Sequence, residues 1–368
     1  MRSKTKNVLN KIMILDQDKL YAKYGSIDIG YATERMPEQF RMTWEATRDL
    51  KLPASYKKCT NVVLMGMGGS AIGPHMIRSI FYKDLKVPFE IFNRYELPAS
   101  ATRNTLVLIS SFSGTTEEIV AAMKEGKRRK LKMAIVSTGG DLIRYAKRYK
   151  IPFYQFDPGD WKETPRLGVG FTITAHMAFM EKAGLLKVRK SHIDKMIKAM
   201  VEVIDSCAVS VKTEENPAKV TAMAIVKKPI LIVAAEHLEG NAHVMQNHIN
   251  ESGKQMARYM ILPELNHHLL EGLTYPTNLF AKYAVLMLRS DLYHKRTQAR
   301  FDITANLFEK MGAEVIDYNC AGKTAVEEGG EVLQFGAFLS YYLAMANKVD
   351  PKAIPYVDKF KKELKKVK

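Results

Sequence analysis

The chain has 368 residues, a length typical of two domains or of one large domain. Its composition, 46% hydrophobic and 26% charged, excludes a disordered chain, a collagen and a small disulfide-rich protein. The net charge of +17 suits an anionic ligand, but the basic residues are spread out and no RNP, KH or zinc-finger signature accompanies them. We therefore expect no nucleic-acid partner.

Cysteine usage and hydropathy favour a cytoplasmic protein. Cys59, Cys207 and Cys320 lie far apart and form neither a metal cage nor a disulfide framework. The apolar run Phe335–Ala346 is shorter than the roughly 18 residues of a membrane span and predicts a buried core helix. The N-terminus is basic but has no apolar core before a cleavage site, which argues against export. We expect a cytoplasmic protein with no membrane partner.

Along the first half, short apolar runs alternate with helical patterns. The predicted strands are Asn61–Met65, Pro88–Phe92, Thr105–Ser110, Met133–Ser137 and Phe153–Phe156. The predicted helices are Ser70–Tyr82, Thr116–Lys127 and Asp141–Lys150. This order indicates βαβ units and hence a parallel sheet with helices on both faces.

A helix-rich stretch, Phe171–Val226, follows, and the alternation then resumes. The predicted strands are Pro229–Ala235, Tyr259–Leu262, Ala284–Leu288 and Glu314–Asp317. The predicted helices are Asn241–Asn250, Thr297–Met311 and Val332–Met345. The fold class is therefore α/β, with two doubly wound subdomains that pack tightly because no low-complexity linker separates them.

The predicted division of the chain has four parts. They are an N-terminal helical extension (1–55), a first subdomain (56–190), a second subdomain (191–350) and a C-terminal helix (351–368). Doubly wound sheets bind ligands at the carboxyl ends of their strands, so the loops at those ends are the candidate sites.

The first such loop is Gly66–Ser70, which follows a strand and opens a helix. Its glycines let the backbone approach an anion, and the helix N–H groups face that anion. With Ala71 the loop also fits the GxGxxA pattern of dinucleotide-binding proteins. Asn93 and Arg94, however, stand where such proteins carry an acidic residue, so we expect no nicotinamide cofactor.

The second loop, SFSGTTEE over Ser111–Glu118, again follows a strand and opens a helix. Its hydroxyl and N–H groups are the donors that a phosphate monoester requires. Thr115 or Thr116 could serve only as a helix N-cap, but a cap does not require Ser111, Ser113 and Gly114 together. A third turn, Ser137–Asp141, closes the next strand in the same style.

The combination of GMGGSA, SFSGTT and STGGDL resembles a SIS (sugar isomerase) domain, which binds phosphosugars with hydroxyl-rich loops. The resemblance implies two SIS-type subdomains and a bound phosphate in the first of them. The residues implied to bind that phosphate are Gly68, Gly69, Ser70, Ser111, Ser113 and Thr116.

Two motifs in the second half resemble a narrower family. NESGK at Asn250–Lys254 and PELNHHLLEG at Pro263–Gly272 are similar to the NENAK and PE-x-x-H-x-x-x-EG signatures of bifunctional phosphoglucose/phosphomannose isomerases. Asp350–Lys361 is similar to that family's closing helix, and Thr164–Arg166 also fits. The resemblance implies a metal-independent aldose–ketose isomerase without a cofactor, which interconverts fructose, glucose and mannose 6-phosphates through a cis-enediol.

The family resemblance also implies a role for each candidate residue. Glu251 is the base that moves a proton between C1 and C2, and Arg166 stabilises the enediolate. His267 and Lys361 are the ring-opening pair. His268 could replace His267, and Lys359 or Lys362 could replace Lys361. The family's assembly implies a homodimer in which His267 reaches the neighbouring subunit's active site.

Three departures from the family pattern limit these expectations. Ile354 stands where threonine is common, NESGK replaces NENAK, and GTT replaces GNT in the second loop. Because isoleucine offers no hydroxyl, glucose 6-phosphate is implied more directly than mannose 6-phosphate. The alternatives are another phosphosugar isomerase or a non-catalytic phosphosugar sensor. Sensors normally carry a DNA-binding helical module, and the residues before Asn61 show no helix-turn-helix pattern.

Overall fold

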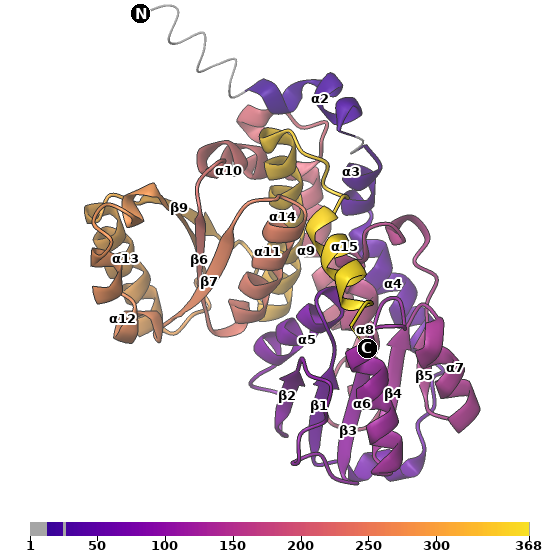
Figure 1. The fold of residues 1–368 in the computed structure, drawn as a ribbon. Coiled ribbons are helices and arrows are strands. Elements are labelled where there is room, and N and C mark those ends of the chain that lie inside the picture. The colour runs from indigo at the N-terminus through magenta and orange to yellow at the C-terminus, as the bar shows by residue number, and fades with distance from the viewer. Residues whose placement is uncertain (1–12, 25–26, 368) are drawn as a thin grey trace, which may run out of the picture.

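The computed structural model describes residues 13–24 and 27–367, which form two parallel sheets flanked by helices (Figure 1). The strands of the first sheet are β1 (Asn61–Met65), β2 (Phe89–Phe92), β3 (Thr105–Ser110), β4 (Lys132–Ser137) and β5 (Phe153–Gln155). They lie in the order β2-β1-β3-β4-β5. All five predicted strands are confirmed, each to within one residue at either end.

The first sheet is covered on both faces because side chains alternate along each strand. The helices of this half are α5 (Gly69–Ile80), α6 (Glu117–Arg128), α7 (Gly140–Tyr149) and α8 (Val169–Lys182). Val63 and Met65 pack in a cluster with side chains of α6 and α7. Val62 and Leu64 face the other way, toward α5 and α8, in a core that continues into the second half. Loops follow the carboxyl ends of the strands.

The second sheet has the order β7-β6-β8-β9. Its strands are β6 (Ile230–Ala235), β7 (Ala257–Leu262), β8 (Ala284–Arg289) and β9 (Glu314–Asn319). The helices of this half are α9 (Lys190–Cys207), α10 (Pro217–Ile225), α11 (Glu239–Glu251), α12 (Leu265–His268), α13 (Lys295–Lys310) and α14 (Ala325–Asn347). The α/β fold with two parallel sheets is thus confirmed.

Helix α14 is the central helix of the second half. It packs against α9, α10 and α11, and its residues are buried almost without interruption from Val326 to Met345. The predicted core helix at Phe335–Ala346 lies within it. Among the described residues, no helix combines the length and the apolar composition needed to cross a membrane.

The two halves pack directly on each other through α5 and α11. Gly240 of α11 lies so close to His75 of α5 that a Cβ at Gly240 would overlap the His75 carbonyl group. Such an approach requires glycine, since any side chain would force the helices apart. The tight packing that the missing linker predicts is therefore present.

Within residues 13–24 and 27–60, three α-helices precede the first sheet: α2 (Asp18–Lys23), α3 (Ile27–Glu34) and α4 (Met36–Thr47). Met36 and Phe40 of α4 are fully buried in the core. The predicted N-terminal extension also includes residues 1–12 and 25–26, which lie outside the described residues, as does Lys368. The proposed limits of the four parts remain predictions.

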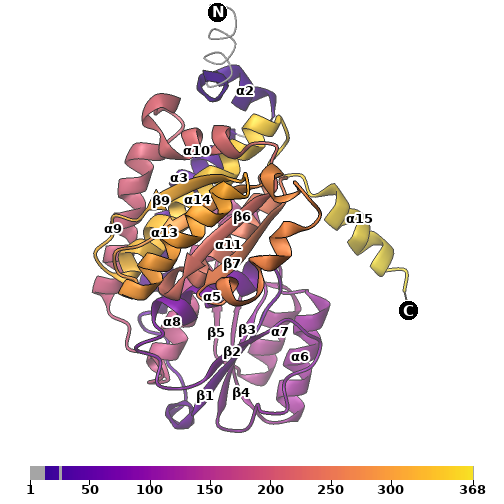
Figure 2. The same ribbon diagram turned by 90° about the vertical axis from the view of Figure 1, so that its left-hand side faces the viewer.

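The last helix, α15 (Pro355–Leu364), has no buried residue. Figure 2 shows it projecting away from the rest of the chain. Its apolar side chains are unusually exposed to solvent: Tyr356 is 87% exposed and Phe360 is 64% exposed. A helix with such an apolar face is typically covered by another surface.

A buried cation joins the N-terminal segment to α10. The Lys219 ammonium group, whose side chain is 1% exposed, donates to Asp16 Oδ1 at 2.9 Å, to the Val209 carbonyl at 3.0 Å and to the Val211 carbonyl at 2.7 Å. A buried charge is tolerated only when it is paired and hydrogen-bonded in this way.

Replacing Lys219 by methionine should lower the free energy of unfolding by about 3 kcal/mol, because the partly buried Asp16 loses its cationic partner and two carbonyl groups lose the Lys219 donor. Urea unfolding followed by circular dichroism measures this change. The matched control is Lys198→Met, since the Lys198 side chain is 79% exposed and pairs with Glu202 on the same helix. The control should change stability by less than about 0.5 kcal/mol. Equal losses in both variants would contradict the assigned role of Lys219.

Candidate functional site

The first glycine-rich loop leads directly from β1 into α5. Gly68 has a φ of +48°, a left-handed conformation that favours glycine, and Gly69 begins the helix. Ser70, in the first turn, accepts a hydrogen bond from the backbone N–H of Phe112 at 2.9 Å. The first loop is thus tied to the second loop, which follows the neighbouring strand β3.

The second loop, Ser111–Thr116, is organised by its own hydroxyl groups. The Ser111 and Thr116 hydroxyls are hydrogen-bonded at 2.8 Å, and Ser111 Oγ accepts the N–H of Gly114 at 3.1 Å. Thr116 occupies the N-cap position of α6, but its side chain accepts no N–H group of that helix. Simple capping therefore does not account for Thr116. Ser113 is exposed and lies in the same loop.

The third loop, Ser137–Gly140, packs against the second loop so closely that their backbones are in contact. The Thr138 hydroxyl donates to the Phe112 carbonyl at 2.8 Å. A Cβ at Gly114, which has a φ of +70°, would overlap the Gly139 carbonyl oxygen, so only glycine fits there. The three loops therefore meet at one edge of the first sheet and present the first turns of α5, α6 and α7 there. Helix N-termini with free N–H groups favour bound anions.

Arg166 connects this edge to the second half of the chain. It lies in the short 3-10 helix η4 (Pro165–Leu167), and its side chain is 3% exposed. A Cβ at Gly69 would lie 3.4 Å from the Arg166 Cα, so Arg166 closely adjoins the first loop. Its Nη1 donates to Glu251 Oε1 at 3.0 Å and forms an ion pair with that carboxylate. The ion pair thus brings the predicted base and the predicted electrostatic residue together.

The other nitrogens of the Arg166 guanidinium group are also engaged. Nε donates to Ser252 Oγ at 2.7 Å. Nη2 donates to the Pro351 carbonyl and, at 3.1 Å, to the Lys352 carbonyl. One side chain therefore links η4, the end of α11 and the segment that leads to α15.

Residues at the end of α11 contact both the side chain and the backbone of Arg166. The His248 imidazole, fully buried, donates from Nε2 to the Arg166 carbonyl at 2.9 Å. Burial lowers the pKa of His248 to about 4, so the ring is neutral near pH 7. The Glu251 carboxylate is 36% exposed, which leaves it open to a substrate while Arg166 is enclosed.

Lys254 lies just beyond this turn. Its ammonium group donates to the Glu251 carbonyl and lies 3.5 Å from the Pro351 carbonyl. Burial and the nearby Arg166 charge lower the pKa of Lys254. A second cation therefore adjoins the Arg166–Glu251 pair.

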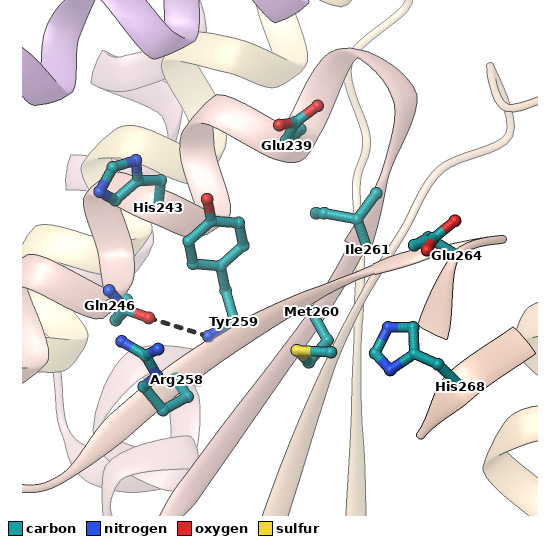
Figure 3. Close-up of a pocket in the computed structure, with 9 residues that line it drawn as sticks. All are labelled: Glu239, His243, Gln246, Arg258, Tyr259, Met260, Ile261, Glu264 and His268. Atoms are coloured by element: carbon teal, nitrogen blue, oxygen red, sulfur yellow. Dashed lines mark hydrogen bonds between the residues drawn. The ribbon is translucent and has the colours of Figure 1, made fainter. Parts of the chain in front are cut away.

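His267 and Lys361 make no described contact with the Arg166–Glu251 pair within one chain. Both side chains are exposed, and no described contact joins either of them to Glu251 or Arg166. The neighbouring His268 lines a pocket of about 470 Å³ together with residues of α11 and β7, among them His243 (Figure 3). Glu251 lies eight residues beyond His243, roughly 12 Å along the helix. His243, which lines this pocket, is thus about two turns of α11 before the predicted base.

Two further contacts were not predicted from the sequence. Ser252 and His248 both bind Arg166, although the motif drew attention only to Glu251. Ser252 is one of the two positions at which NESGK departs from the family signature, so that departure was the available signal. Among the described residues, no group of three or more His, Cys, Asp or Glu side chains converges as a metal site would require.

Comparisons with known proteins show which families the sequence resembles. Residues 214–364 match the family model of the bacterial phospho-glucose isomerase C-terminal SIS domain. A bifunctional phosphoglucose/phosphomannose isomerase of Caldicellulosiruptor bescii is 27% identical over 334 residues, which cover 90% of this chain and 98% of that protein. Its counterpart in Aquifex aeolicus is 26% identical over 83% of this chain and 90% of its own length.

Solved structures share the fold. A hypothetical protein of Thermus thermophilus superposes with a TM-score of 0.75 at 17% identity, over 99% of this chain and 95% of that chain. A glucosamine-6-phosphate deaminase of Thermotoga maritima gives a TM-score of 0.65 at 12% identity, over 89% and 96%. The sequence matches confirm the resemblance that the motifs indicate: residues 214–364 are similar to a SIS domain, and most of the chain is similar to bifunctional phosphoglucose/phosphomannose isomerases.

Proposed function

We propose that the protein is a metal-independent aldose–ketose isomerase that interconverts fructose 6-phosphate with glucose 6-phosphate and mannose 6-phosphate. The observation that carries the proposal is the ion pair between the buried Arg166 side chain and the partly exposed Glu251 carboxylate. The pair lies beside the first glycine-rich loop. A base, a fixed cation and an anion-binding edge are the parts that such a reaction requires. The relatives named as bifunctional isomerases support the same reaction.

The phosphate is assigned to the edge formed by the three loops. Gly68, Gly69 and Ser70 open α5, and Ser111, Ser113 and Thr116 precede α6. These loops offer N–H and hydroxyl donors at the positive ends of helices, where a dianion is favoured. The net charge of +17 would also attract an anionic substrate over longer distances.

The proton transfer is assigned to Glu251. Its carboxylate takes the proton from C2 of the open-chain aldose, the C2–H electron pair forms the C1–C2 double bond of the cis-enediolate, and O1 takes the negative charge. The proton then passes from Glu251 to C1 while the proton of the O2 hydroxyl passes to O1, which leaves the C2 carbonyl of the ketose. Negative charge develops on the substrate oxygens in the intermediate, and Arg166 stabilises it without exchanging a proton. Within the described residues, all but one of the guanidinium N–H donors have protein acceptors, and the remaining one, on Nη1, is adjacent to Glu251.

Ring opening is assigned to His267 and Lys361 in a homodimer. His267 is exposed and has no described contact with its own Glu251, as expected of a residue that serves a second copy of the chain. The exposed apolar side chains of α15, Tyr356 and Phe360, are also consistent with a surface covered by another copy. His268, Lys359 and Lys362 are the alternatives for these roles.

The first test is turnover of fructose 6-phosphate by the purified protein in excess chelator, with both products quantified. We expect glucose 6-phosphate and mannose 6-phosphate.

Glu251→Gln should lower kcat by about 10³-fold while calorimetry still detects substrate binding, because only the base is lost. The control Glu202→Gln, on the exposed face of α9, should keep full activity. Substrate binding without turnover by the unmodified protein would instead favour a phosphosugar sensor.

The product ratio should depend on residue 354, which occupies the N-cap position of α15 and is partly buried. Ile354→Thr supplies a hydroxyl group and more space beside the C2 epimer. We expect this variant to form several-fold more mannose 6-phosphate relative to glucose 6-phosphate. Ile354→Val, which adds space without a hydroxyl, separates the two effects. An unchanged ratio in both variants would remove residue 354 from substrate selection.

The donation of His267 across subunits is tested by mixing inactive chains. Glu251→Gln and His267→Ala should each be inactive alone. In a hybrid dimer, one site combines the intact Glu251 of one chain with the intact His267 of the other, so co-expression should restore turnover. If His267 acted within its own chain, no hybrid site would be complete and the mixture would stay inactive.

A further inference from the structure

The orientation of the Arg166 guanidinium group is set by contacts on two of its edges. Nη2 is held by the Pro351 and Lys352 carbonyls, and Nε is held by Ser252 Oγ at 2.7 Å. The Nη2 contacts hold one corner of the planar group, while the single bond from Nη1 to Glu251 involves a partly exposed carboxylate. The contact at Nε holds a second corner of the group and so determines where Nη1 points.

Nη1 is the nitrogen that matters for the reaction. It donates to Glu251 at 3.0 Å and carries the N–H group for which the described residues provide no acceptor. Any rotation of the guanidinium plane would move this N–H away from the oxygens of a substrate that adjoins Glu251. Electrostatic stabilisation depends on such alignment, since a donor must already face the charge that develops.

Ser252 is placed to do this without touching the substrate. Its residue is 3% exposed, and it follows Glu251 directly at the C-cap of α11. The neighbouring residue His248 binds the backbone carbonyl of Arg166 and leaves the guanidinium group unconstrained. Among the described residues, Ser252 Oγ is the sole acceptor for Arg166 Nε, so its removal would leave a buried donor unsatisfied.

We propose that Ser252 is a positioning residue for the isomerisation, which holds the Arg166 guanidinium plane so that Nη1 faces both Glu251 and the enediolate. The proposal rests on the proposed function, in which Arg166 stabilises that intermediate. Ser252 is one of the positions at which NESGK differs from the NENAK signature, and the proposal gives this residue a role.

The kinetic test compares Ser252→Ala with Ser252→Thr, which keeps a hydroxyl group. Ser252→Ala should lower kcat about tenfold and leave KM for fructose 6-phosphate within about twofold, because stabilisation is lost only in the transition state. Ser252→Thr should recover most of the lost kcat. The matched control is Ser206→Ala, since the Ser206 hydroxyl near the end of α9 donates to its own helix at Val203. This control should leave kcat unchanged.

A second measurement reports on Arg166 independently of turnover. In protein with ¹⁵N-labelled arginine, the buried Nε–H should give a slowly exchanging NMR signal, identified by its absence in Arg166→Lys. Ser252→Ala should shift that signal and speed its exchange with water, whereas Ser252→Thr should preserve it.

Two results would overturn the proposal. The first is an unchanged kcat or an unchanged Nε–H signal in Ser252→Ala. The second is a purely structural defect, in which Ser252→Ala lowers the melting temperature and raises KM as much as it lowers kcat, without recovery in Ser252→Thr. An unmodified protein that lacks turnover would refute the proposed function, while the NMR signal would still decide whether Ser252 holds Arg166.

Discussion

The buried charge of Arg166 is the constraint on which the site depends. A guanidinium group that is 3% exposed must find acceptors inside the protein, because an unpaired buried charge is strongly unfavourable. Its acceptors are the Glu251 carboxylate, the Ser252 hydroxyl and two carbonyls of the C-terminal segment. Satisfying this one side chain therefore fixes the relative positions of η4, the end of α11 and the start of the segment that leads to α15.

The contact between the two halves explains why such a site forms at their junction. The first sheet supplies an edge of three interlocked loops, and the second half supplies Glu251 from the end of α11. Gly240 allows α11 to approach the backbone of α5, and the first loop lies beside Arg166 at Gly69. The proposed phosphate site and the proposed base are thus held by rigid elements rather than by a flexible linker, which favours a fixed geometry between them.

Much of the fold could be predicted because parallel strands are buried on both faces and appear as short apolar runs. Strands such as Thr105–Ser110 are found where the pattern predicts them, while the helix predicted at Val332–Met345 is longer in the structure. Site prediction was less complete. The motifs indicated Glu251 and Arg166, which the structure brings together. The departure of NESGK from the family signature marked Ser252 as unusual but not as a partner of Arg166, and no motif marked His248. The roles of His267 and Lys361 stay predictions, because one chain does not bring them to Glu251.

The sequence by itself determined the α/β class, the order of the strands along the chain and the loops that end them, since these follow from local hydrophobic period and from glycine and hydroxyl placement. The motifs also determined the relationship to the phosphosugar isomerases. Only the tertiary structure decided which polar groups satisfy Arg166, and that α15 stands away from its own chain. The reason is physical: a hydrogen bond between residues 86 positions apart, such as Arg166 to Ser252, depends on how two halves of the chain pack, and no local pattern encodes that distance.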